Sequence, residues 1–175
     1  GSSGDDSYTI TKTAGGGAKI QITDGSHRLT LGSSIEVVTL KLGDGNDTVN
    51  IEDLRGVTGT LLAIYGEGGN DTLTAVDSRG GTVRMLLDGG DGNDTITGSD
   101  GDDSLYGGDG NDLLLGGDGD DTINAGASDD TIVGGDGNDK LRGGKGDDGT
   151  PGGRLPASSS GRRARPDSAG LGGHG

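Results

Sequence analysis

The chain has 175 residues, of which 42 are glycine and only 26% are hydrophobic, and its formal net charge is −15 at pH 7. Because ordinary globular domains are about half apolar, this composition excludes a conventional two-layer hydrophobic core. An acidic chain repels phosphates, which disfavours nucleic acid as a partner, and no run of about 18 apolar residues is present that could span a membrane. A divalent cation is the natural counterion.

The first part of the chain predicts a linker followed by strands. Residues 1–6, GSSGDD, are interpreted as a linker or cloning scar, and residues 7–88 as parallel β-helical coils. Two similar segments, LGDGNDTVN (42–50) and GEGGNDTLT (66–74), place Asp47 and Asp71 at matching positions. The residues before each of these glycine turns alternate between apolar and polar, which predicts a strand with one buried face.

An earlier segment, IQITDGSHRLTL (20–31), fits the same frame, but His27 stands where the other segments have Asp. We therefore predict that it forms a coil without a metal site.

From Gly89 to Asp148 the chain runs in unbroken nonapeptides, the last of them partial, of which GGDGNDTIT (89–97) is the first. Position six is always Asp and position eight is always aliphatic until the pattern stops after Asp148. Such a period is the signature of a repeat architecture. The fold class we predict is all-β: an 18-residue-per-coil parallel roll over residues 89–148, continuing from the wider coils before it.

Each nonapeptide divides into a six-residue turn and a three-residue strand with one inward side chain. We expect the glycines at positions one, two and four to supply the positive φ angles of a tight turn. If successive turns alternate between two edges of a flattened coil, each Asp stacks on the Asp eighteen residues later. One edge then carries Asp47, Asp71, Asp94, Asp112, Asp130 and Asp148, and the other carries Asp103, Asp121 and Asp139.

Stacked carboxylates on neighbouring parallel strands lie about 4.8 Å apart, where they repel by roughly 1 kcal/mol per pair in water. A hard cation between them reverses the sign of that interaction. Calcium accepts six to eight oxygen ligands, including backbone carbonyls, in flexible geometry, whereas magnesium requires a stricter octahedron. The chain has no cysteine and only two distant histidines for a softer metal, so the residues favour several calcium ions.

These nonapeptides resemble the RTX, or hemolysin-type, calcium-binding repeats, whose consensus is G-G-x-G-x-D-x-U-x with U aliphatic. The resemblance implies a right-handed parallel β-roll with calcium held between turns of adjacent coils. It also implies that one turn supplies the carbonyls of positions two and four and its Asp. The turn one coil later supplies the carbonyls of positions one and three and its own Asp.

Carried onto this sequence, the scheme implies four full ligand sets. On one edge they are Gly90, Gly92 and Asp94 with Gly107, Asp109 and Asp112, and then Gly108, Gly110 and Asp112 with Ala125, Ala127 and Asp130. On the other they are Ser99, Gly101 and Asp103 with Gly116, Asp118 and Asp121, and then Gly117, Gly119 and Asp121 with Gly134, Asp136 and Asp139. A further site would join Asp130 to Asp148, and Asp47 and Asp71 would hold calcium upstream. Ala125 and Ser128 replace glycine, which predicts strain in that turn.

No catalytic motif is present: there is no H-E-x-x-H and no G-x-S-x-G, and an EF-hand or phosphate loop does not fit the spacing. Residues 149–175 lack the period and are expected to be disordered. The resemblance implies a monomeric, non-catalytic folding module of a secreted, extracellular bacterial protein with no membrane span. Two alternatives stay open: a surface or matrix adhesive module, and an accessory module of a secreted hydrolase or epimerase.

Overall fold

The computed structural model describes residues 3–12, 20–23, 28–30, 37–52, 54, 57–75 and 82–149. All the regular structure in these residues is β, and no helix that could cross a membrane occurs among them.

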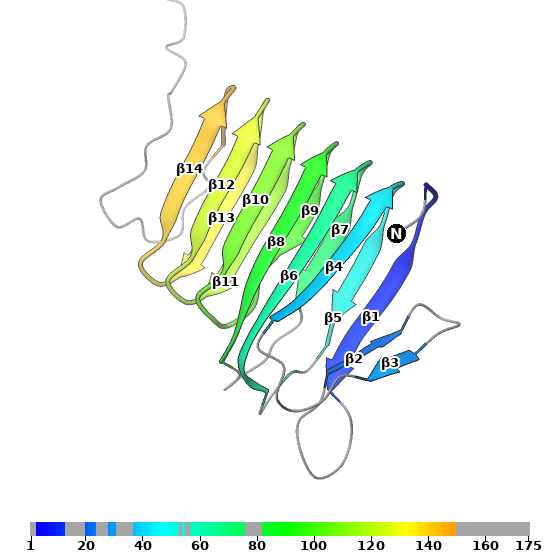
Figure 1. Cartoon of the computed structure of the whole chain (residues 1–175). Coiled ribbons are helices and arrows are strands. Elements are labelled where there is room, and N and C mark those ends of the chain that lie inside the picture. Colours follow the sequence, from blue (N-terminus) through cyan, green and yellow to red (C-terminus); the bar gives the residue numbers. More distant parts are fainter. Residues whose placement is uncertain are drawn as a thin grey trace, which may run out of the picture.

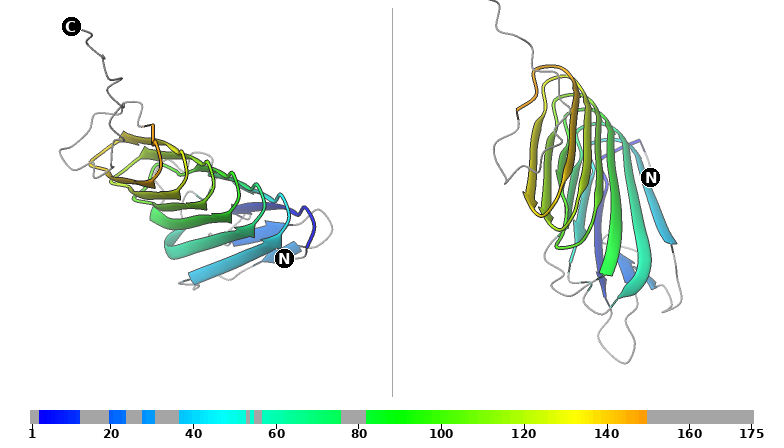
Figure 2. Two further views of the ribbon diagram at one scale, coloured as in Figure 1. Left: turned by 90° about the horizontal axis from the view of Figure 1, so that it is seen from above. Right: turned by 90° about the vertical axis from the view of Figure 1, so that its left-hand side faces the viewer.

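In the described residues, fourteen strands form two sheets that lie face to face along a flattened coil (Figures 1 and 2). One sheet has the order β13-β11-β9-β7-β5-β1-β2-β3 and the other β14-β12-β10-β8-β6-β4. The strands are β1 (Ser7–Lys12), β2 (Ile20–Thr23), β3 (Arg28–Thr30), β4 (Val37–Asp44), β5 (Thr48–Ile51), β6 (Thr58–Gly68), β7 (Thr72–Ala75), β8 (Thr82–Asp91), β9 (Thr95–Thr97), β10 (Ser104–Asp109), β11 (Leu113–Asp118), β12 (Thr122–Ala127), β13 (Thr131–Asp136) and β14 (Lys140–Lys145).

The register of the strands confirms the predicted coil. Leu105 of β10 lies opposite Ile123 of β12, and Ile96 of β9 lies opposite Leu114 of β11, so that neighbouring strands of one sheet are parallel and eighteen residues apart. Upstream the spacing widens as expected, with Val49 opposite Leu73 in parallel strands β5 and β7. The chain therefore winds as a parallel β-roll whose first coils are wider than the rest.

The core lies between the sheets and consists of stacked aliphatic columns. The position-eight residues of the repeats are buried, from Ile96 at 0% exposure to Leu141 at 8%. In the wider coils the register aligns Val38 with Leu62 and Leu62 with Met85, which adds a second buried column in β4, β6 and β8. Each roll repeat thus buries its position-eight aliphatic side chain, to which one repeat adds Ala125, whereas each wider coil buries more.

The prediction that residues 20–31 form a parallel coil is wrong. Strand β2 pairs antiparallel with β1, and β3 pairs antiparallel with β2, at the end of the sheet. The reason is connection length: parallel neighbours need a crossover of a dozen or more residues, whereas seven residues separate β1 from β2 and four separate β2 from β3.

Residues 3–6 also differ from the linker that the sequence predicts. The backbone N–H of Asp6 donates to Asp47 Oδ1 at 2.6 Å, and Asp5 Oδ1 accepts from the backbone N–H of Asn46 at 2.8 Å. Strand β1 then runs parallel to β5, so this segment continues the roll beyond the turn at Asp47.

Both sheets pass without interruption through residue 88, where the sequence suggests a change from wider coils to the roll. At the other end, Gly149 still forms a parallel bridge with Thr131. The expected disorder after Asp148 concerns residues of which all but Gly149 lie outside the described part of the chain.

Candidate metal centre

The aspartates at position six line the two edges of the roll, each directly before a strand or, for Asp148, before the bridging residue Gly149. The sequence has nine aspartates at this position. Eight of these side chains are at most 5% exposed although an aspartate is ordinarily charged. These eight are Asp47, Asp71, Asp94, Asp103, Asp112, Asp121, Asp130 and Asp139. The ninth, Asp148, is half-buried. A row of buried carboxylates is expensive unless each is compensated.

One oxygen of each carboxylate accepts a hydrogen bond from the backbone of the preceding coil. The N–H of Asp94 donates to Asp112 Oδ1 at 2.8 Å, and the N–H of Asp112 donates to Asp130 Oδ1 at 2.9 Å. The opposite edge repeats this pattern, with the N–H of Asp121 donating to Asp139 Oδ1 at 3.1 Å. The stacking of Asp side chains one coil apart, predicted from the period of the sequence, is thereby confirmed.

The other oxygen is left without a partner at most of these positions. Among the described residues, seven position-six carboxylates have an Oδ2 atom that is buried and accepts no hydrogen bond: those of Asp47, Asp71, Asp94, Asp112, Asp121, Asp130 and Asp148. Such orphaned buried oxygens are rare in folded proteins. A row of them is what a cation site leaves when only the protein atoms are considered.

Backbone carbonyls converge on the same points. A side chain placed on Gly107 would overlap both Asp112 Oδ2 and the carbonyl oxygen of Ala125 one coil later. Gly116 stands in the same relation to Asp121 Oδ2 and the carbonyl oxygen of Gly134. A carboxylate oxygen of one turn therefore meets the position-one carbonyl of the next, and the donor set consists of hard oxygens that suit calcium.

The glycines of the turns serve two different purposes. Positive φ angles occur at positions two and four, for example 123° at Gly108 and 131° at Gly110. The expectation of positive φ at position one is wrong, because Gly107 does not adopt it. At Gly107 and Gly116 a Cβ would instead occupy the space of the converging oxygens, although the repeat that begins at Ala125 accommodates a methyl group at this position.

In the part of the chain that the structure describes, two residues other than glycine take the left-handed conformation, Glu67 with φ 78° and Ser128 with φ 89°. The predicted strain in the turn that contains Ser128 is therefore present, since this conformation is costly for residues with a side chain.

Burial raises the pKa of these carboxyl groups. Desolvation, with the neighbouring carboxylates adding to it, raises the pKa of Asp94 to about 6 and those of Asp112 and Asp121 to about 7. The pKa values of Asp71 and Asp130 are raised for the same reason. Without a cation, these buried sites therefore hold protons more tightly than an ordinary aspartate does.

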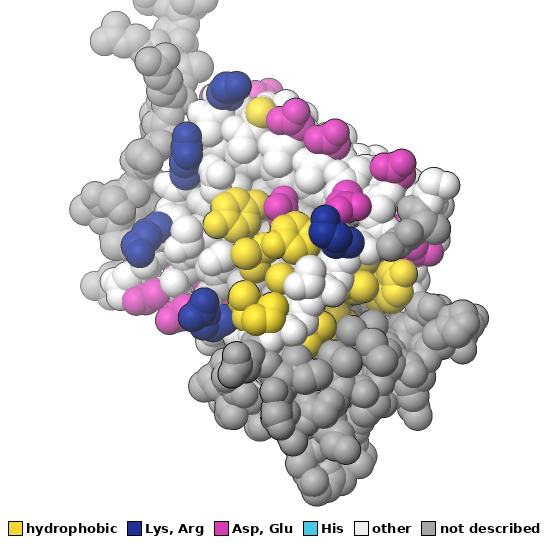
Figure 3. Space-filling view, viewed as in Figure 1, with side chains coloured by type: hydrophobic (Ala, Val, Ile, Leu, Met, Phe, Trp, Pro, Cys, Tyr) yellow, Lys and Arg dark blue, Asp and Glu magenta, His cyan; other side chains and the backbone are white. Residues whose placement is uncertain are grey.

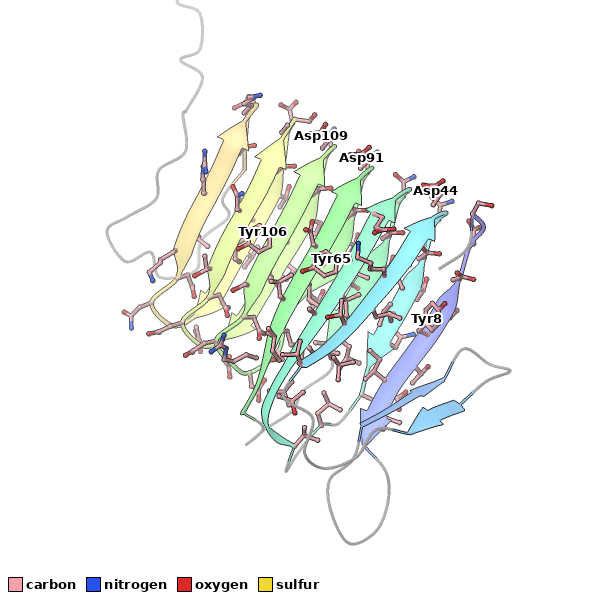
Figure 4. All side chains as sticks on the ribbon, in the orientation of Figure 1. Tyr8, Asp44, Tyr65, Asp91, Tyr106 and Asp109 are labelled. Atoms are coloured by element: carbon pink, nitrogen blue, oxygen red, sulfur yellow. The ribbon has the colours of Figure 1, made fainter. Side chains whose placement is uncertain are left out.

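The aspartates at position three point away from the sites. Asp44, Asp91 and Asp109 extend from the turn tips at one edge of the sheet formed by β4 to β14, and all three are exposed (Figure 4). The carbonyl oxygen of Asp109 accepts from the N–H of Gly92 at 2.7 Å. A carbonyl has two lone pairs, so this bond leaves capacity for a further ligand bond.

No group of three or more His, Cys, Asp or Glu side chains suited to a metal occurs in the described ranges. The structure brings together the position-six aspartates and the position-one carbonyls of the ligand sets, and the individual ligand assignments stay predictions.

The turn at residues 98–103 departs from the others. Asp103 Oδ2 accepts hydrogen bonds from both the backbone N–H and the hydroxyl of Ser99, at 2.8 and 2.9 Å. The oxygen that has no partner at seven other positions is satisfied here by the protein itself.

The sequence interpretation missed a second ladder at position five. The N–H of Asn93 donates to Asn70 Oδ1 at 2.7 Å, and the N–H of Asn111 donates to Asn93 Oδ1 at 2.8 Å. Asp5 begins this ladder, as Asp6 begins that of position six. The signal was present, because GSSGDDSYT (1–9) has Gly, Asp, Asp and Tyr at positions four, five, six and eight.

These features define a class of protein: a parallel β-roll whose stacked turns offer buried carboxylate and carbonyl oxygens to cations. The model of the RTX calcium-binding nonapeptide repeat matches four copies in the chain, at residues 63–75, 88–123 and 115–149. The residues that this model matches are therefore RTX calcium-binding nonapeptide repeats. Comparisons with curated proteins and with solved structures find no match.

Proposed function

We propose that the chain is a non-catalytic module of a secreted bacterial protein that folds when it binds several calcium ions outside the cell. The observation that carries the proposal is the row of seven buried Oδ2 atoms without hydrogen-bond partners. RTX repeats are typical of secreted bacterial proteins, which supports the location.

The physical mechanism is linkage between binding and folding. The unfolded chain does not hold two turns eighteen residues apart in register, so calcium binds the folded state and stabilises it by mass action. Asp112 and Asp121 belong to opposite edges of one coil, and each shares its ions with turns one coil away. Binding at one level therefore orders its neighbours, which makes folding cooperative.

The ligand assignments within this proposal follow the sets given above. Asp94, Asp112 and Asp130 supply carboxylates along one edge, and Asp121 and Asp139 supply them along the other. The bound ion would supply the positive charge that compensates these buried carboxylate oxygens. The upstream turns at Asp47 and Asp71 carry the same orphaned oxygen and are included in the proposal.

Calcium titration of the whole chain, followed by circular dichroism and calorimetry, tests this function. The expected result is cooperative formation of β structure with several ions bound per chain, while magnesium at equal concentration gives a weaker response. A chain that shows its full β signal in EDTA and binds no calcium at several millimolar would overturn the proposal.

An adhesive role is a second candidate, and a specific surface favours it. One sheet consists of the even-numbered strands from β4 to β14. On its outer face, Tyr65, Asp88 and Tyr106 lie side by side on β6, β8 and β10. Apolar side chains gather at the middle of this face and basic side chains lie around them (Figure 3). Exposed aromatic rings with adjacent polar groups suit carbohydrate, and Tyr106 is 36% exposed.

This second role is tested by affinity electrophoresis in gels that contain neutral polysaccharides, with calcium present. An adhesive module is retarded by at least one of them, and Tyr106→Ala removes the retardation. Thr97→Ala, on the opposite sheet, is the control. Equal mobility in every gel would count against adhesion to glycans.

A further inference from the structure

In one turn of the roll, residues 98–103, the side chains hydrogen-bond to each other and to the backbone of the same turn. Asp103 accepts two hydrogen bonds through Oδ2 from Ser99, and the hydroxyl of Ser99 also accepts from the backbone N–H of Gly101 at 3.3 Å. Ser99 and Asp103 are 5% and 2% exposed. These bonds form a small buried network inside residues 98–103.

The backbone of this turn differs from that of the others. Gly90, Gly92, Gly117 and Gly119, at positions two and four of neighbouring repeats, all have positive φ, whereas Ser99 and Gly101 do not. Elsewhere the position-four N–H donates to a carbonyl one coil later, as Gly119 donates to Asp136 at 2.8 Å. In the deviating turn the Ser99 hydroxyl takes that N–H instead.

The turn is also tied to the wider coils. Asp103 Oδ1 accepts from the backbone N–H of Met85 in β8 at 3.1 Å, where the later Asp residues of this edge accept from the preceding Asp. It is the first nonapeptide turn on its edge, since the previous one in sequence, at Asp94, lies on the opposite edge. Its hydrogen bonds therefore join the end of the wider coils to the start of the roll.

We infer that residues 98–103 form a hydrogen-bonded cap that needs no calcium, and that Ser99 alone separates it from a calcium site. This inference rests on the proposed function, because it assumes that the other turns bind calcium. An ion between Asp103 and Asp121 would have to displace two hydrogen bonds to Asp103 Oδ2, while at Asp112 or Asp121 the same atom has no partner to lose. The set that pairs Ser99, Gly101 and Asp103 with Gly116, Asp118 and Asp121 is then the one unused set on this edge.

The cap gives the roll a defined starting point. A turn that holds itself together without metal presents the carbonyls of Ser99 and Gly101 to the following turn, against the backbone of Gly117 and Gly119. The next coil can dock onto this template before calcium fills the sites beyond it. Folding on this edge would therefore proceed from Asp103 toward Asp139.

The test is the number of calcium ions bound by the full chain, measured by equilibrium dialysis with metal analysis and by titration calorimetry. Ser99→Gly restores the glycine of the repeat and should add about one ion per chain. Asp103→Asn should leave the number of ions unchanged, whereas Asp112→Asn should lower it. Ser104→Gly, in the same repeat but outside the network, is the matched control for Ser99→Gly.

The outcomes separate this inference from the proposed function. If Asp103→Asn lowers the ion count as Asp112→Asn does, or if Ser99→Gly adds no ion, the cap is a calcium site like the others or cannot become one, and the inference fails while the function stands. If the unmodified chain binds no calcium, the proposed function fails and the inference fails with it.

Discussion

The wider coils and the roll carry the same ladder of aspartates on very different amounts of apolar core. In the wider coils the strands β4, β6 and β8 bury Val38, Leu62 and Met85 in addition to the column that continues into the roll. In the roll each repeat buries its position-eight aliphatic residue, and Ala125 is the one further buried apolar side chain among the described roll repeats. The roll therefore carries a second row of buried carboxylates, at Asp103, Asp121 and Asp139, but has less hydrophobic compensation than the wider coils.

This difference indicates which part of the chain depends on a metal ion to fold. Carboxylates stacked at the same spacing repel equally in both regions, and Asp47 and Asp94 both keep a buried oxygen without a hydrogen bond. Only the wider coils have a second apolar column to offset that cost. We expect the roll to need calcium to fold and the wider coils to retain structure more readily.

Removal of calcium should produce the largest contrast between the two regions. In excess EDTA, amides of strands β10 to β14 should exchange hydrogen at rates near those of an unfolded chain, while amides of β4, β6 and β8 stay partly protected. Hydrogen exchange with mass spectrometry measures both in one sample. Equal protection in the two regions would show that apolar burial does not separate them.

The effect of the Asp112→Asn substitution on the protein should depend on whether calcium is bound. Asparagine keeps an oxygen that can accept from the N–H of Asp94, but it removes a buried charge. Calcium affinity should fall at least about tenfold, or about 1.4 kcal/mol, while the metal-free protein should become no less stable. Titration calorimetry and urea unfolding in EDTA measure the two effects.

The control for this substitution is Asp109→Asn in the same repeat. Its side chain is exposed and its backbone carbonyl is retained, so both measurements should match the unmodified protein. A loss of calcium affinity in this control equal to that of Asp112→Asn would contradict the assignment of the ligand to the buried carboxylate.

The pH dependence should have opposite directions with and without calcium. The folded-state pKa values of Asp94, Asp112 and Asp121 are raised to about 6, 7 and 7. A raised pKa means that the metal-free fold binds more protons than the unfolded chain, so its extra stability is complete below about pH 4 and is lost as the pH rises through 6 to 7. Calcium affinity should rise over the same window because protons must leave.

Thermal unfolding in EDTA at a series of pH values measures the first effect, and calcium titration at the same values measures the second. A metal-free melting temperature that increases from pH 5 to pH 8 would contradict the assignment of raised pKa values.

The smallest effect is expected from relief of backbone strain. Ser128 has φ 89° in a turn where the neighbouring repeats have glycine, so Ser128→Gly should stabilise the calcium-loaded protein by about 1 kcal/mol. The other non-glycine residue with positive φ in the described part of the chain is Glu67, at position two of a turn of the wider coils, and its carboxylate pairs with Lys41 Nζ at 2.7 Å. Glu67→Gly relieves strain but loses this contact, so its gain should be smaller. Thermal unfolding of both variants in calcium makes the comparison.

Much of this protein could be predicted from the period of its sequence. The strict recurrence of Asp112 and Leu114 every eighteen residues leaves one arrangement in which both stack, because a parallel strand pairs only with its equivalent one coil away. The prediction was less accurate where the sequence departs from this period. The segment at 20–31 kept the pattern of a coil, but the short connections on either side of β2 allowed only antiparallel pairing.

By itself the sequence determined the coil length, the two edges, the buried aliphatic at position eight and the hard-oxygen character of the sites. Only the tertiary structure decided which glycines are needed for φ and which for space, because both kinds look alike in a repeat. It also decided that Asp6 stacks on Asp47 across forty-one residues and that Ser99 satisfies Asp103. Both contacts depend on which atoms come together when the folded turns take their final conformation, and the repeat period of the sequence does not specify those atoms.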